Sequence, residues 1–148
     1  YSQFHHAALH RPDGDKYDAE LHLVHKSPYK DGSTIVLAVL LRIDETVSKR
    51  FDEKFYSALE SCGGNITTLT ELPFNPKNWL PIGANTATCY EGSLQIDGKE
   101  REVTWVLIGT RKITENQFQQ IFGKTKPHNL PLQPRNRRYV VEYSWTPK

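Results

Sequence analysis

The histidines are the residues of this chain best suited to chemistry. His5, His6 and His10 stand in the opening stretch "YSQFHHAALH", and His22 and His25 follow in "ELHLVH". Imidazole nitrogens are common ligands of zinc and other divalent transition metals. Neighbouring residues on a strand point to opposite faces, so one strand does not bring His5 and His6 to the same metal. The spacing therefore raises the question of whether a metal site here is complete.

Two segments with strand patterns position these groups. The stretch "AELHLVH", residues 19–25, has strand length and places Glu20, His22 and Val24 on one face. The stretch "STIVLAVLLRID" is a nearly continuous run of leucine and β-branched residues, which is typical of a central strand covered on both faces. We therefore expect the polar face of the first segment to point inward or into a site.

The later sequence predicts more strands and a few helices. The apolar residues of 44–62 recur at four-residue spacing and predict a helix, and residues 65–90 have the Pro, Asn and Thr content of a long irregular connection. "YEGSLQI" and "EREVTWVLIG" predict a hairpin with its turn at Asp97 and Gly98. Thr114 and Gln117 form a capping box before a short helix that stops at Gly123, and "RRYVVEYSW" predicts a final strand.

Length and composition predict one soluble domain spanning residues 1–148. The chain has 37% hydrophobic residues, a net charge of +2 and no apolar run of membrane-spanning length. This charge is too small to indicate nucleic-acid binding. Cys62 and Cys89 permit one disulfide, and the sequon at Asn65 slightly favours secretion or an organellar lumen.

Several blocks in order resemble the C-terminal part of an α-class carbonic anhydrase. They are "QFH", "KYDAELHLVH", "LAVLL", "YEGSL", "VTWVLI", "ITENQFQQIF" and "PLQPRNRRYVV", and the match runs from Gln3 to about Val141. The resemblance implies a large, twisted, mostly antiparallel sheet with a few helices, whose N-terminal part is missing here. It also implies a zinc ion held by three histidines, with a bound water that ionises near neutral pH and attacks carbon dioxide.

The resemblance assigns a role to each site residue and shows where the sequence departs. His5 matches the first zinc ligand and His22 the third, and Glu20 matches the carboxylate that orients a ligand histidine. The second ligand position falls on Ala7. His6 and His10 are possible substitutes, and a bulge would be needed to turn His6 toward the other histidines; otherwise we expect both on the surface or in loops.

Two further positions depart from the family pattern. Leu9 stands where an acidic residue is usual, and Gln95 stands where the family has the threonine that aims the zinc-bound hydroxide. Gln95 and Ile96 together replace two threonines. The zinc ligands, the acidic residue at position 9 and the threonine at position 95 are thus all changed. No residue is therefore assigned as catalytic.

The sequence supports three hypotheses. The first is a carbonic-anhydrase-like pseudoenzyme without a cofactor that acts as a structural, scaffold or binding subunit of a larger assembly. The second is an active zinc enzyme in which His6 or His10 completes a rearranged ligand set. The third is a surface binder of anionic glycans through Arg135, Arg137 and Arg138. In each case we expect a protein partner or a missing N-terminal segment to cover the exposed sheet edge.

Overall fold

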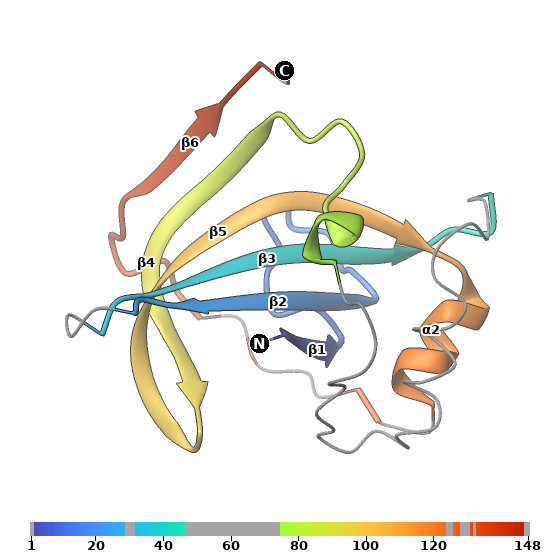
Figure 1. Ribbon diagram of the computed structural model, residues 1–148, viewed down its shortest axis with the longest axis horizontal. Helices are drawn as coiled ribbons and strands as arrows, with labels where there is room; N and C mark the ends of the chain where they lie inside the picture. Colours follow the sequence, from blue (N-terminus) through green and yellow to red (C-terminus); the bar gives the residue numbers. More distant parts are fainter. Residues whose placement is uncertain are drawn as a thin grey trace.

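A single six-stranded sheet organises the protein (Figure 1). The computed structural model describes residues 2–28, 32–46, 75–123, 126–127, 131 and 133–146. The strands are β1 (Ser2–His6), β2 (Ala19–Lys26), β3 (Thr34–Ile43), β4 (Thr86–Ile96), β5 (Lys99–Ile113) and β6 (Val140–Ser144). Their order is β1-β2-β3-β5-β4-β6, and every neighbouring pair is antiparallel except β3 and β5. The expected mainly β, mostly antiparallel fold is confirmed.

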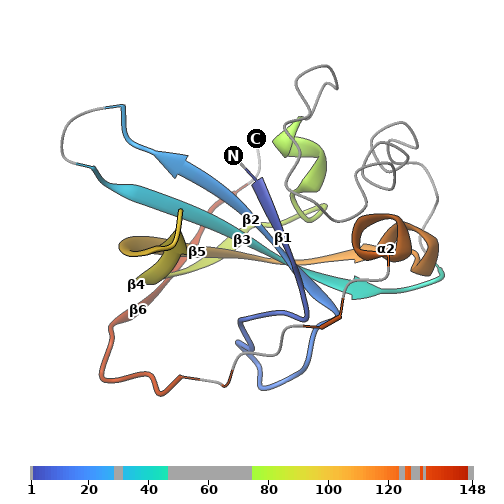
Figure 2. The same cartoon turned by 90° about the horizontal axis from the view of Figure 1, so that it is seen from below.

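One face of the sheet is covered by helices. The α-helix α2 (Glu115–Phe122) and the 3-10 helix η1 (Pro76–Trp79) lie on this side (Figure 2). Their buried side chains pack on the inward residues of β2 and β3 and form the first core, namely Ala19, Leu21, Leu23, Val39, Leu41, Trp79, Ile113, Phe118, Ile121 and Phe122. This core fixes β2, so that the other face of β2 is presented in a defined position.

The second core lies on the opposite face of the sheet. It comprises Val24, Val36, Ala38, Leu94, Ile96, Val103, Trp105 and Leu107. β3 lies between β2 and β5 in the sheet. Its side chains alternate between the two faces, so it contributes to both cores. The prediction of a central strand buried on both faces is therefore confirmed, and the polar face of β2 lies beside the second core.

Local sequence signals set the turn and the helix ends. β4 and β5 form the predicted hairpin, and Asp97 and Gly98 take the positive φ values of 53° and 72° that a tight turn requires. At α2 the Thr114 side chain accepts from the N–H of Gln117, and the Gln117 side chain accepts from the N–H of Thr114. Gly123 ends this helix at a φ of 52°.

The structure also corrects or leaves open some expectations. β4 begins at Thr86, so the predicted irregular connection of residues 65–90 is wrong for its last residues, where β-branched threonines pair across to β6. The predicted helix over 44–62 lies almost wholly outside the described residues, as do Asn65 and Cys62. Cys89 is a free, partly buried thiol. Among the described residues, no helix is long and apolar enough to cross a membrane.

Candidate functional site

Strand register brings three of the polar side chains together. β1 runs antiparallel to β2 with His5 opposite Glu20 and Gln3 opposite His22. Because opposed residues point to the same face, His5, Glu20 and His22 share the face of the second core. The rings of His5 and His22 lie with their centroids 4.2 Å apart. Glu20 and His22 are fully buried.

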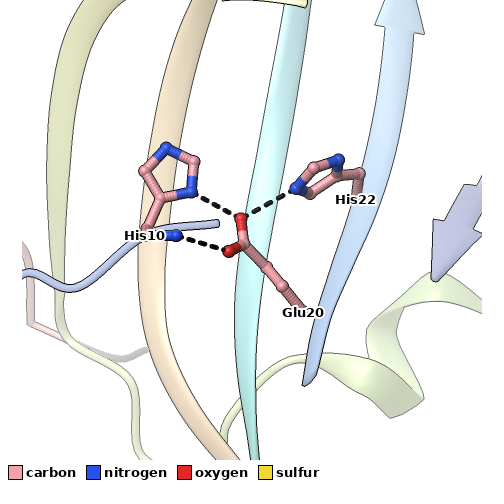
Figure 3. Close-up of side chains that lie close together, drawn as sticks. All are labelled: His10, Glu20 and His22. Atoms are coloured by element: carbon pink, nitrogen blue, oxygen red, sulfur yellow. Dashed lines mark hydrogen bonds and ion pairs between the residues drawn. The ribbon is translucent and has the colours of Figure 1, made fainter. Parts of the chain in front are cut away.

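Glu20 is the centre of a hydrogen-bond network (Figure 3). One carboxylate oxygen accepts from the backbone N–H groups of Leu9 and His10, each at 2.9 Å. The other oxygen lies 2.5 Å from His10 Nδ1 and 2.8 Å from His22 Nε2. Four nitrogens from three residues thus converge on one buried side chain, which ties the loop after β1 to β2.

The network decides the charge of Glu20. Burial disfavours the carboxylate, but the hydrogen bonds from His10 and His22 outweigh it and hold the pKa of Glu20 well below its usual range. Glu20 is therefore ionised and can accept but not donate hydrogen bonds. Both imidazoles must present an N–H to it, so the protonated nitrogens are Nδ1 of His10 and Nε2 of His22.

This arrangement leaves one atom of His22 available. A neutral imidazole with its proton on Nε2 carries a lone pair on Nδ1. The Nδ1 atom of His22 is buried and makes no hydrogen bond among the described residues. A carboxylate that orients one imidazole nitrogen while the other points at a metal is the usual support of a metal-ligating histidine. His22 therefore has the tautomer and orientation of a ligand.

Tyr90 and Trp105 form the wall beside His10. The Tyr90 hydroxyl lies 2.5 Å from His10 Nε2, and burial together with the Glu20 charge raises the pKa of Tyr90 to about 12. The Trp105 ring packs edge-on against His10 and His22, with centroid distances of 4.6 and 4.8 Å. Gly92 lies against this ring, and a Cβ there would lie 2.8 Å from Trp105 Cδ1.

The second ligand position has a different local structure. β1 ends at His6, and Ala7 follows in the left-handed region with a φ of 69°. The N–H of Ala7 donates to the carbonyl of Asp18 at 2.9 Å. The chain therefore leaves the strand at this residue. If β1 continued, alternation would place the side chain of residue 7 on the same face as His5. Ala7 itself offers no donor atom.

The two possible substitutes lie in different places. His6 is on the opposite face of β1, stacked on Phe122 at a centroid distance of 4.8 Å, as strand alternation predicts. His10 is in the loop after β1, but its ring is packed against Trp105 rather than lying on the surface. The loop position is one of the two alternatives expected for His10, and Glu20 and Tyr90 hold its ring inward by engaging both of its nitrogens.

Gln95 does not approach the histidines. It is exposed on β4 between the buried Leu94 and Ile96, whose side chains belong to the second core. Because β4 continues as a regular strand through Ile96, alternation turns residue 95 to the other face of the sheet.

His25 is exposed on β2 and its Nδ1 bonds the carbonyl of Leu23. Arg135, Arg137 and Arg138 are exposed in the turn before β6.

The described donors do not form a complete zinc cage. His10, Glu20 and His22 lie close enough for each to offer one ligand atom. Ligand atoms of a tetrahedral zinc lie about 3.3 Å apart, given bonds of about 2.0–2.1 Å. The observed 2.5 and 2.8 Å separations to Glu20 are hydrogen-bond distances instead. The His22 and His5 rings lie side by side on this face, but two imidazoles are one protein ligand short of a catalytic site.

Comparison with known proteins identifies the family. The model of eukaryotic-type carbonic anhydrases matches residues 2–142. The chain belongs to this carbonic anhydrase family. A carbonic anhydrase of Nostoc sp. is 31% identical over 143 residues, which cover 94% of this chain and 51% of that protein. The chain therefore spans about half the length of this curated relative.

Solved structures show the same fold. The α-carbonic anhydrase of Thermovibrio ammonificans, in complex with sulfanilamide, aligns with a TM-score of 0.71 and 25% identity over 94% of this chain and 60% of its own. A carbonic anhydrase of Chlamydomonas reinhardtii, in complex with acetazolamide, gives 0.69 and 28% over 95% and 63%. The sequence resemblance to the α class is thus confirmed for family and fold.

Proposed function

We propose that this chain is a carbonic-anhydrase-like domain without carbon dioxide hydration activity that serves as a structural or binding subunit. The observation that carries the proposal is the end of β1, where Ala7 takes the second ligand position at a φ of 69°. The strand that supplies two zinc ligands in the family offers only His5 on this face, because His6 points to the opposite one. Catalytic zinc needs three protein ligands and one open position for water.

Two neighbouring features support the same conclusion. A zinc-bound hydroxide must be aimed at its substrate, and misplacement by about 1 Å can cost 100-fold in rate. Gln95 is exposed on the other face, so it cannot orient a nucleophile at His5 and His22. Leu9 contributes its backbone N–H to Glu20 but no side-chain carboxylate. The positions that aim the nucleophile in the family are therefore unsuited to that role here.

The proposal is tested by the hydration assay. Stopped-flow measurement of carbon dioxide hydration with one equivalent of zinc should give the rate of a zinc blank in the same buffer. The His22→Ala variant is the matched control, because it removes the best-placed ligand. Zinc-dependent acceleration that disappears in His22→Ala would refute the proposal. Far-ultraviolet circular dichroism verifies that both proteins are folded in the assay.

A zinc enzyme with a rearranged ligand set is the second candidate. It is favoured by the buried His22 Nδ1, which has no hydrogen-bond partner among the described residues. Recruitment of His10 would require breaking its bond to Glu20 or to Tyr90. If His10 is the third ligand, His10→Ala lowers the zinc stoichiometry as much as His22→Ala does. If it is not, His10→Ala leaves zinc binding unchanged.

The outer edge of β1 is the surface where we propose protein cover. β1 is a terminal strand of the sheet and pairs only with β2 among the described strands. Such an edge presents backbone N–H and C=O groups that a further strand can pair with. Either a partner protein or a further segment of a family domain fits this edge. Binding of anionic glycans by Arg135, Arg137 and Arg138 stays a prediction.

A further inference from the structure

Three arginines share one tight turn just before β6 (Figure 1). The N–H of Arg138 donates to the carbonyl of Arg135 at 3.0 Å. Between them, Asn136 and Arg137 have φ values of 50° and 58°. Positive φ at both central residues is the mark of a type I′ turn. The turn therefore presents Arg135, Arg137 and Arg138 together, and all three residues are exposed.

The backbone conformation of Arg137 is unfavourable for its residue type. The second central position of a type I′ turn is usually glycine, because a side chain in the left-handed region meets the backbone. Asn136 tolerates this region through its short polar side chain, whereas arginine lacks that advantage. The Arg137 side chain makes no hydrogen bond, ion pair or ring contact with a described residue. No contact within the described fold thus offsets the conformational cost of Arg137.

The turn also brings like charges together. Arg135 and Arg138 are its first and last residues, so their Cα atoms lie less than about 7 Å apart. Arg135 Nε donates to the carbonyl of Arg138 at 3.2 Å, which holds the Arg135 guanidinium beside Arg138. Among the described residues, no Asp or Glu forms an ion pair with any of the three arginines. An anion from outside the chain would relieve this repulsion.

We propose that this turn binds the sulfate esters of an anionic polysaccharide, with Arg137 as the main contact. A guanidinium presents its N–H groups in a planar fork that fits two oxygens of such an anion. Arg135 uses Nε within the turn and keeps the four N–H groups of its terminal nitrogens for a ligand. This inference rests on the binding role proposed above, names the chemistry of the partner, and involves none of the histidines.

The small extent of the site favours a sulfated sugar over nucleic acid. The three arginines lie within four consecutive residues, and the net charge of the chain is only +2. Nucleic-acid binding usually requires a broad basic stripe, because one phosphate follows another along the strand. A sugar unit can carry more than one sulfate group, so its charge is concentrated enough for a single turn.

Isothermal titration calorimetry of the 148-residue chain with a short heparin oligosaccharide in low salt tests the proposal. The wild type should bind heparin, and desulfated heparin should not bind. Arg137→Gly should raise the dissociation constant about tenfold, since hydrogen bonds to a charged group are lost. Lys77→Gln is the matched control, because it removes one exposed positive charge from η1, and it should leave the dissociation constant unchanged.

Stability gives a second readout that separates binding from folding. Glycine adopts the left-handed region without steric cost, so Arg137→Gly should raise the urea midpoint while it weakens heparin binding. An arginine retained for folding alone would give the opposite change, a lower midpoint. Circular dichroism verifies that wild type and variants have the same secondary structure.

Four results would overturn the proposal. They are a wild type that does not bind heparin, an Arg137→Gly variant that binds as tightly as the wild type, a lower urea midpoint for this variant, and single-stranded DNA that binds as tightly as heparin. The carbon dioxide hydration assay depends on the histidines rather than on this turn. Failure of heparin binding is therefore distinguishable from failure of the proposed function.

Discussion

The substitution Glu20→Gln tests whether the buried network holds the site together. Glutamine has nearly the size of glutamate, so the change removes the charge and one acceptor without opening a cavity. Four N–H groups converge on the Glu20 carboxylate, from the backbone of Leu9 and His10 and from the rings of His10 and His22. The test therefore isolates hydrogen bonding from packing.

The expected loss follows from the geometry. The amide oxygen of glutamine can accept from the two N–H groups on one side, whereas its NH₂ group must face the two donors on the other side. Each buried donor without an acceptor costs about 1–3 kcal/mol. We expect the free energy of unfolding to fall by about 2–6 kcal/mol, which overlaps the about 3–5 kcal/mol lost when a buried ion pair is broken. That is a large part of the free energy of unfolding of a typical domain, which is about 5–15 kcal/mol.

Urea denaturation at pH 7 measures this loss. Trp105 packs against His10 and His22, so its part of the fluorescence of the three tryptophans reports on the site. Glu102→Gln, the same substitution at an exposed position of β5, is the control and should change stability by no more than about 0.5 kcal/mol. A loss below about 1 kcal/mol for Glu20→Gln would show that the four hydrogen bonds contribute little net stability, contrary to this prediction.

Two further predictions concern the aromatic wall of the site. Gly92→Ala should lower stability by about 1–3 kcal/mol in the same urea assay, since a Cβ 2.8 Å from Trp105 and 3.0 Å from Tyr90 overpacks two large rings; an unchanged midpoint would contradict this packing. The difference titration at 295 nm between wild type and Tyr90→Phe should give a pKa of about 12 for Tyr90. The unfolded chain ionises first, so this group's contribution to stability should be lost between about pH 10 and 12; ionisation of Tyr90 at pH 10 would contradict its burial beside Glu20.

Features that depend on local sequence were predictable. The turn at Asp97 and Gly98 and the capping box of Thr114 and Gln117 involve residues close in the chain, and each fixes backbone conformation through its own side chain. Strand alternation likewise placed Glu20 with His22 on one face of β2, away from Leu21. These signals require no knowledge of distant contacts.

Contacts between distant segments were not predictable in the same way. His10 lies in a loop without periodicity, and its bonds to Glu20 and to Tyr90 join residues 10 and 80 positions apart. The outward orientation of Gln95 depends on β4 continuing through Ile96, which is set by pairing with β5. A lone histidine or glutamine carries no local signal for either outcome, because strand register decides both.

Zinc content per chain tests the central claim most directly. The purified wild-type chain is dialysed against a weak chelator and analysed by inductively coupled plasma mass spectrometry, with His22→Ala treated in parallel. With Ala7 in place of a ligand, we predict well below one tenth of a zinc ion per chain in both proteins. Close to one zinc ion per wild-type chain, lost in His22→Ala, would show instead that the ligand set is complete.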